Sequence, residues 1–267
     1  MGFKLIRYTR SFLQMADAYF DEPLPPAGVD VFMLYEWPAA VAGGLCTPFS
    51  TIIVDLAKDP EKLLAEMNSE TRYEIRRASN KDGVIYQTFE RPQPADISQF
   101  ALHYEEFAAS KGLPQMDRSV LQRAADAGAL DLSTVGFSPS EPVIWHAYYR
   151  DRRRATLRYS ASMYRSNAEK EYRARVGRAN RYHHWRDMMR FRDAGDLVYD
   201  FGGWYAGTED EDMLRINRFK EGFGGTVIKT YNCIVPKTWK GRFAFTVRSR
   251  VQWPLSRLHR RIAGLSA

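Results

Sequence analysis

Short apolar runs alternate with helical periodicities over most of the chain, and this alternation predicts a mixed α/β fold. A short run rich in β-branched and aromatic residues predicts a buried strand. The third and fourth runs, joined by the charged segment 151–154, predict a hairpin that crosses the centre of the sheet. The runs are STIIVDL (50–56), VIYQTF (84–89), PVIWHAYYR (142–150), ATLRYSASMY (155–164), DLVYDF (196–201) and TVIKTYNCIV (226–235).

Helices are predicted between these strands. Asp59-Pro60 has the residue types of an N-cap and a first helical position, so a helix is expected to begin there. Its apolar residues lie on one face, and it is expected to continue through SETRYEIRRASN and end at Asp82-Gly83. The remaining helices are predicted over 96–112, 119–129, 180–195 and a short segment that ends at Lys220.

The first 50 residues do not follow this pattern, because it is interrupted by Pro23, Pro25, Pro26, Pro38 and the pair Gly43-Gly44. We therefore predict three parts: an N-terminal segment (1–50), an α/β domain (51–235) and a basic C-terminal tail (236–267).

The positive charge is concentrated in this tail. Residues 236–267 hold eight Lys or Arg and no Asp or Glu, which leaves 31 basic and 32 acidic residues in the rest of the chain. Such a segment can attract a nucleic acid, an anionic membrane face or a phosphorylated substrate, or it can simply be a solvated tail. Aromatic residues lie among the charges, and WPLSRLHRRIAGL (253–265) has the pattern of a short amphipathic helix, which favours an interfacial role.

A cytoplasmic location is expected from three features. There is no run of about 18 apolar residues, and no apolar core of signal-peptide length follows the basic start MGFKLIRYTRSF. Cys46 and Cys233 are far apart, and this spacing predicts neither a disulfide framework nor a metal site. The basic tail adds the expectation of peripheral contact with the inner membrane face.

The most specific stretch is YDFGGWY (199–205), followed by INRFKEGFGG (216–225). A strand that ends at Asp200 places a carboxylate at the sheet edge where open α/β sheets bind ligands. Lys220, flanked by Phe219 and Phe223, can stabilise the negative charge that develops on a carbonyl during acyl transfer. Alternatively, the lysine only complements the helix dipole and the glycines only turn the chain.

These motifs resemble the closing segment of the FemAB-like transferases, in which FK-x-GFGG is typical. The earlier segments TIIVDL, TRYEIRRA and KGLPQMD (111–117) are similar to the same family in the same order. The resemblance implies a GNAT-type fold, a mixed central sheet flanked by helices, and transfer of an acyl or aminoacyl group onto an amine. It places Phe219 and Lys220 at the transfer site. Because FemAB-like enzymes have two GNAT-like domains, it implies that residues 1–50 are a remnant of the first.

The donor, acyl-CoA or aminoacyl-tRNA, is expected to bind at an Arg-rich helix start. The register of an acetyl-CoA motif gives Gly177 and Ala179, with Ala174 in place of the leading Arg or Gln. Backbone amides at a helix N-terminus can hold a pyrophosphate, and the nearby arginines can bind phosphates of coenzyme A or tRNA, or remain exposed surface residues. The predicted donor-binding residues are Arg165, Arg173, Arg175, Gly177, Arg178, Asn180, Phe219 and Phe223.

Other candidates are weaker. Arg72 and Arg76 lie near one face of a helix, which is typical of a solvated surface, although the resemblance favours substrate contact. Tyr159 is a core or sheet-surface residue or lines the acceptor site. His183 and His184 are adjacent in a helix and so point in different directions, which predicts one packed and one exposed histidine and no metal site.

The resemblance therefore predicts an N-acyltransferase. An amine, carried by an anionic or lipid-linked acceptor such as a cell-envelope precursor, attacks the activated donor. Asp200 accepts the amine proton, and Lys220 stabilises the oxyanion. The alternative is a non-catalytic degenerate GNAT module that binds a membrane or a biosynthetic partner.

Overall fold

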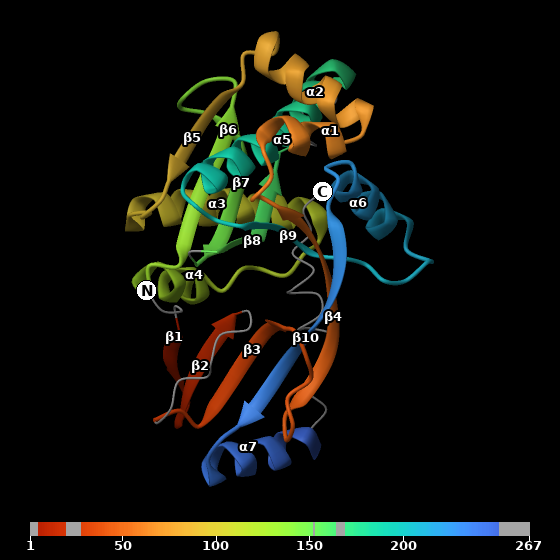
Figure 1. The fold of residues 1–267 in the computed structure, drawn as a ribbon. Helices are drawn as coiled ribbons and strands as arrows, with labels where there is room; N and C mark the ends of the chain where they lie inside the picture. The colour runs from red at the N-terminus through yellow and green to blue at the C-terminus, as the bar shows by residue number, and fades with distance from the viewer. Residues whose placement is uncertain (1–4, 20–27, 152, 164–168, 251–267) are drawn as a thin grey trace.

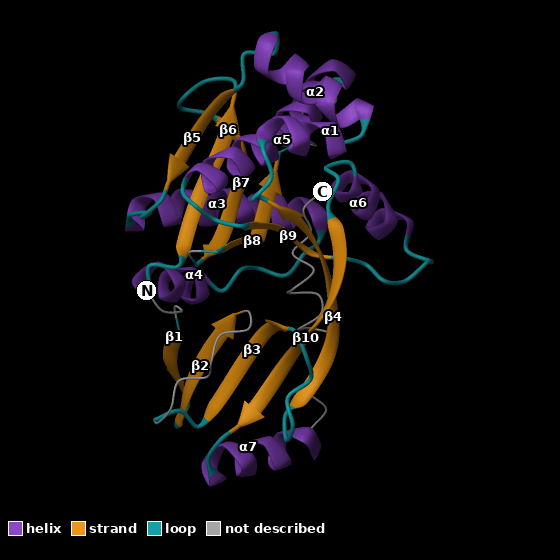
Figure 2. Cartoon of the chain, viewed as in Figure 1, coloured by secondary structure: helices purple, strands orange, loops and turns teal. Residues whose placement is uncertain are grey.

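A single mixed sheet runs through the part of the chain that the computed structural model describes, which is residues 5–19, 28–151, 153–163 and 169–250 (Figures 1 and 2). Its strand order is β1-β2-β3-β10-β4-β9-β8-β7-β6-β5. The strands are β1 (Ile6–Arg10), β2 (Leu13–Tyr19), β3 (Val31–Trp37), β4 (Leu45–Asp55), β5 (Ile85–Phe89), β6 (Leu130–Gly136), β7 (Pro142–Arg150), β8 (Arg154–Ser162), β9 (Val198–Gly203) and β10 (Thr226–Pro236). The helices are α1 (Pro60–Glu66), α2 (Ser69–Asn80), α3 (Pro94–Lys111), α4 (Arg118–Asp126), α5 (Lys170–Asp193), α6 (Glu211–Glu221) and α7 (Trp239–Arg250).

Two long strands connect the two halves of the sheet. β4 and β10 have 11 residues each and pair antiparallel along most of their length. In Figure 1 they extend from the lower half, with β1 to β3, into the upper half, with β5 to β9. The pairs β2–β3 and β8–β9 are parallel, and the other neighbouring pairs are antiparallel.

The upper half of the sheet is buried on both faces. Along β7, Trp145 and Tyr149 pack in the cluster formed with α3 and α4, while Tyr148 packs in the cluster formed with α1, α2 and α5. Because successive side chains of a strand point to opposite faces, a strand covered on both sides has a continuous apolar sequence. This is why the run PVIWHAYYR contains so few polar residues.

The helix predicted from Asp59 to residue 81 is two helices. α1 begins at Pro60 as expected, but Asn68 ends this stretch and caps α2, its side chain accepting a hydrogen bond from the Thr71 amide at 2.7 Å. The Asn68 amide donates to the carbonyl of Gly222, at 3.0 Å, in the GFGG segment. A tertiary contact therefore fixes a break that the apolar spacing does not reveal.

Three other expectations about the elements change. Residues 1–50 complete the sheet through β1 to β3, and the predicted boundary at 50/51 falls inside β4. Strand β6, inserted between β5 and β7, was not predicted from the sequence. The helix expected at 180–195 begins ten residues earlier, at Lys170, because the Arg-rich segment is itself helical.

Cys46 and Cys233 form a disulfide, which corrects the prediction from their spacing. The two residues are 187 positions apart, but they lie directly opposite each other on β4 and β10. Strand pairing thus brings together cysteines whose sequence spacing gives no indication of contact. Persistent disulfides are typical of oxidising compartments. The cysteines therefore no longer support the cytoplasmic location that was expected from the sequence, because the cytoplasm is a reducing compartment.

None of the helices in the described residues combines the length and the apolar character needed to span a membrane.

Candidate functional site

Five polar side chains from five different elements meet where the two halves of the sheet join, and we call them the central cluster. In a flat sheet, β3 and β8 would be separated by four strand spacings, roughly 19 Å. The guanidinium of Arg154 on β8 nevertheless contacts the carboxyl group of Glu36 on β3, so the sheet folds over on itself at this point. The central cluster consists of Glu36, Thr51, Arg154, Asp200 and Lys220.

Asp200 is fully buried, and both of its carboxylate oxygens accept hydrogen bonds. Arg154 donates to its carboxylate through Nε at 3.0 Å and through a second nitrogen, and the Thr51 hydroxyl also donates to it. The Gly202 amide donates to Oδ1 at 2.7 Å. Burial by itself would raise the pKa of Asp200, but Arg154 and these hydrogen bonds outweigh it and lower the pKa. A carboxylate held in this way is a weak proton acceptor, so its contacts favour a positioning role over the predicted role as a base.

Glu36 completes the ion cluster and was not identified from the sequence. It is 2% exposed, and its backbone has φ of 57°, a left-handed conformation that is unusual outside glycine, asparagine and aspartate. The side chain of Asn232 accepts a hydrogen bond from its amide at 3.0 Å. Burial, and then the nearby Asp200, raise the pKa of Glu36. The available signal was a single carboxyl group inside the apolar run VFMLYEW.

Lys220 lies at the end of α6 with its ammonium group inside the protein. It is 3% exposed, and Nζ donates to the carbonyl of Gly203 at 2.6 Å and to that of Gly202 at 3.2 Å. Burial lowers its pKa to about 8, against the opposing attraction of Asp200. An ammonium group has three donors, so these two contacts leave one for a bound group.

The lysine lies where two parallel strands separate. β8 and β9 pair only from Arg154–Thr156 to Val198–Asp200, although β8 continues to Ser162 and β9 to Gly203. The register of β9 against β4 also shifts between Thr51 and Ile53, which is the mark of a bulge. Bulges and separating parallel strands re-aim backbone groups, and both are common beside binding sites.

Solved structures share this architecture. No protein-family model and no curated protein matches the chain in sequence. FemX superimposes with a TM-score of 0.56 and 15% identity, over 68% of this chain and 61% of FemX. The chain shares its fold with FemX. The prediction of a FemX-type fold, a mixed sheet flanked by helices, is thereby confirmed, while the chain spans less than two thirds of the length of FemX.

Two further structures extend the fold match over nearly the whole chain. A C-terminal DUF2156 domain from Agrobacterium fabrum, named for lysylphosphatidylglycerol synthetase, gives a TM-score of 0.53 at 12% identity and covers 98% of this chain and 87% of its own. L-PGS from Bacillus licheniformis gives 0.50 at 12% identity and covers 90% of this chain and 85% of its own. The N-terminal strands are therefore included in the match with the Agrobacterium fabrum domain.

Glycines of the GFGG segment let this FemX-type fold close against α1 and α2. A Cβ on Gly224, whose φ is +77°, would lie 2.5 Å from the carbonyl oxygen of Glu66. A Cβ on Gly222 would lie 2.6 Å from the hydroxyl of Thr71. The segment therefore needs glycine for close approach, and its packing fixes the end of α6 that carries Lys220.

Alanine at Gly224 is expected to destabilise the protein by about 2–4 kcal/mol, because both the backbone conformation and the space are unsuitable. Gly177 is the matched control, since it lies inside α5 with nothing within 4 Å of an added Cβ. There, alanine should raise stability by about 0.5–1 kcal/mol. Urea unfolding of the two variants measures both values, and equal effects of the two substitutions would contradict this interpretation.

The predicted donor-binding arginines have structural partners. Arg178 is buried and forms an ion pair with Asp82 at 2.6 Å, and Arg175 donates to the Asp82 carbonyl and lies 3.7 Å above the ring of Phe137. Gly177 and Asn180 lie inside α5, so their amides belong to the helix rather than to its N-terminus, which corrects that part of the phosphate prediction. The reason is the earlier start of α5. Arg173 is partly exposed near the N-terminus of α5, and Arg165 lies outside the described residues.

The predicted substrate-binding residues have contacts with α1 and α3. Arg72 donates to carbonyls at the end of α1, including that of Ala65 at 3.3 Å, and so satisfies a helix C-terminus. Arg72 and the exposed Arg76 line an open groove of about 450 Å³ beside α1. Tyr159 packs edge-on against Tyr104 of α3, at 5.2 Å between ring centroids.

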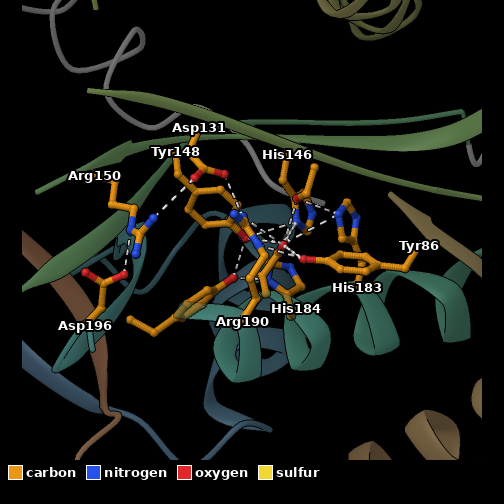
Figure 3. A network of polar contacts seen from close by, with 12 residues as sticks. Tyr86, Asp131, His146, Tyr148, Arg150, His183, His184, Arg190 and Asp196 are labelled. Carbon is orange, nitrogen blue, oxygen red and sulfur yellow. Dashed lines mark hydrogen bonds and ion pairs between the residues drawn. The ribbon is translucent and has the colours of Figure 1, made fainter. Parts of the chain in front are cut away.

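A second group of polar side chains, the interior network, lies between β7 and α5 (Figure 3). Its centre is Asp187, which accepts from the hydroxyls of Tyr148 at 2.7 Å and Tyr86 at 2.8 Å. Tyr148 also contacts the hydroxyl of Tyr199 at 2.7 Å, and Tyr199 contacts Nδ1 of His184 at 2.6 Å. Burial by itself would raise the pKa of Asp187, but His183, His146 and Arg190 outweigh it and lower the pKa.

Both histidines of the pair 183–184 are buried, so the expectation of one exposed ring was wrong. His183 stacks on His146, while His184 contacts the rings of Phe219 and Phe223. The reason is that α5 is covered on more than one side, by the sheet and by neighbouring helices. Phe219 and Phe223, which flank Lys220 in the sequence, therefore pack against His184 of the interior network.

One part of the interior network has the composition of a metal site. Ligand atoms of His146, His183 and Asp187 lie within 4.8 Å of one another. The two imidazole rings, however, are stacked with centroids 3.7 Å apart and planes 4° from parallel. A metal ion binds in the plane of an imidazole ring, and parallel planes share no point. This geometry favours a hydrogen-bonded cluster over shared metal ligation.

Proposed function

We propose that the chain is an N-acyltransferase that moves an acyl or aminoacyl group from an activated donor to an amine. The observation that carries the proposal is Lys220, a buried ammonium group beside the point where β8 and β9 separate. Such a cation, in a site of low dielectric, stabilises developing negative charge far better than an exposed lysine does. The FemX-type fold and the neighbours named for lysylphosphatidylglycerol synthesis support a transferase.

In the proposed reaction, a neutral amine attacks the carbonyl carbon of a thioester or an aminoacyl ester. The oxyanion of the tetrahedral intermediate accepts a hydrogen bond from Lys220. Collapse forms the amide and breaks the bond to the sulfur of coenzyme A or to the ribose oxygen of the tRNA, and this leaving atom takes up the proton that the amine loses. Asp200 holds Arg154 and the bulge of β9 in place and keeps a negative charge near the lysine.

The donor is proposed to approach the N-terminal end of α5 near Arg173. The first amides of a helix have no partners within the helix, and they suit the phosphates of coenzyme A or of a tRNA end equally well. The acceptor is proposed to be anionic or lipid-linked, in keeping with the positive charge of the C-terminal tail.

Thermal unfolding with candidate donors tests the proposal and separates the donor classes. A ligand present at a hundredfold excess over its Kd should stabilise the protein by about 2.7 kcal/mol. Acetyl-CoA, longer acyl-CoAs, and charged and uncharged tRNA are the probes. A shift with one acyl-CoA assigns that donor class, and a shift only with tRNA assigns aminoacyl transfer. If none of them shifts the transition, the chain is the non-catalytic binding module, and the proposed reaction is wrong.

A further inference from the structure

Exposed aromatic and basic side chains gather at one end of the lower half of the sheet. Four of the eight large hydrophobic residues that are exposed in the described part of the chain lie there: Phe12 (64%), Leu45 (56%), Trp239 (75%) and Phe243 (62%). Most exposed apolar residues on soluble proteins are scattered singly, so this grouping calls for a partner.

Strand register places these residues at the same end. Met15 of β2 and Pro236 of β10 both pair with Val31 of β3, and Leu45 pairs with Ile234 of β10. The turn that contains Phe12 directly precedes β2. α7 follows directly after β10 and crosses this end of the sheet (Figure 1), with Gly241 packed against the carbonyl of Asp30. We call this end the basic pole.

The exposed charges in the described part of the basic pole are positive. Lys237, Lys240 and Arg242 are exposed beside Trp239 and Phe243, which are four residues apart and so share a face of α7. Asp30 is the one acidic residue in the described segments that form the pole. These segments are 10–14, 28–31, 41–46 and 234–244. Asp30 is 9% exposed and accepts hydrogen bonds from Thr238 and the Gln14 amide.

We propose that the basic pole docks onto an anionic lipid membrane. Aromatic side chains are favoured at the boundary between headgroups and acyl chains, and lysine and arginine bind the anionic headgroups around them. A nucleic acid would use the cations but would leave an aliphatic Leu45 without a function. A protein partner would favour an apolar centre with fewer like charges. The inference stands on this surface and is independent of the transferase reaction.

The test is co-sedimentation of the full chain with vesicles of mixed phosphatidylcholine and phosphatidylglycerol, compared with pure phosphatidylcholine. Binding should require the anionic lipid and should fall as salt is raised. The double variant Trp239→Ser/Phe243→Ser should weaken binding at least tenfold. Lys237→Glu/Lys240→Glu should weaken it by more, since each cation near the surface contributes roughly fivefold.

Matched controls separate the pole from general surface effects. Tyr73→Ser/Leu102→Ser removes exposed apolar groups on α2 and α3, and Arg215→Glu/Lys229→Glu reverses exposed cations on α6 and β10. Circular dichroism and melting temperature show that each variant is folded. Control variants that bind as the native chain does support the proposal.

Three results would overturn the inference. The first is absence of binding to anionic vesicles, and the second is equal loss in the pole and control variants. The third is a different partner: self-association abolished by Trp239→Ser/Phe243→Ser, or binding to tRNA that the charge reversals abolish while vesicle binding is unchanged.

Discussion

Replacing Lys220 with methionine is expected to lower kcat for acyl transfer by about 10²–10³-fold, the usual effect of removing one donor to an oxyanion. Methionine is similar in length and apolar, so the side chain can remain in place while the positive charge is lost. KM for the donor should change little, because the interaction is proposed to form in the transition state. Release of the coenzyme A thiol, or deacylation of aminoacyl-tRNA, measures the rate with the donor that the thermal-shift experiment selects.

The same substitution has a signature in stability. The pKa of Lys220 is about 8 in the folded protein against 10.5 for an ordinary lysine, so between these pH values the unfolded chain binds more protons. The stability of the native protein should therefore rise with pH from about 8 to 10.5, by up to about 3 kcal/mol, relative to Lys220→Met. Denaturant unfolding of both proteins at a series of pH values measures this difference.

The exposed Lys229 on β10 gives the matched control, since Lys229→Met removes a lysine that solvent surrounds. It should leave kcat unchanged. If Lys220→Met kept the native kcat but showed the pH effect, the lysine would be a structural support for the carbonyls of Gly202 and Gly203. If it showed neither effect, its ammonium group would not be buried as described.

Replacing Arg154 with methionine is expected to destabilise the protein by about 3–5 kcal/mol at neutral pH. The substitution removes the counterion that Asp200 and Glu36 share and leaves two buried carboxyl groups near each other. The loss should be smaller at about pH 5 than at about pH 8, because protonation of Glu36 relieves the repulsion. Urea unfolding at these two pH values measures both effects.

Two further variants show whether charge is the cause. Arg153→Met alters the neighbouring exposed arginine and should change stability by less than about 0.5 kcal/mol. Adding Glu36→Gln to Arg154→Met should restore part of the stability, since it removes the repulsion between two buried carboxylates. In Arg154→Met, Glu36 still has Arg158 as a counterion, at 3.8 Å in the native protein, so the restoration should be partial. A loss that is independent of pH, and that Glu36→Gln does not reduce, would instead indicate that the packing of the arginine side chain is responsible.

The local pattern of the sequence was sufficient for most strands and helices of the upper half, although it missed β6, the break between α1 and α2, and the start of α5. The apolar residues of a run such as STIIVDL favour burial in any fold. The start of α1 at Asp59-Pro60 is set by local backbone preferences, which the sequence shows directly. The motif FKEGFGG and its order relative to TRYEIRRA also allowed the FemAB-like fold to be predicted. β1 to β3 were missed because prolines lie between β2 and β3 and directly after β3, and because β3 is held by pairing with β10, a strand almost 200 residues later.

By itself, the sequence determined which segments are apolar, which segments form most of the helices, and that Lys220 lies at the end of a helix. The strand expected to end at Asp200 continues to Gly203, because a bulge carries β9 past this residue. Only the tertiary structure decided what these residues contact. The folding of the sheet brings Glu36 to Arg154, the pairing of β4 with β10 joins Cys46 to Cys233, and α7 lies across the end of the lower strands. The physical reason is that periodicity records burial along one element, whereas ion pairs, disulfides and surface patches depend on contacts between residues far apart in the chain.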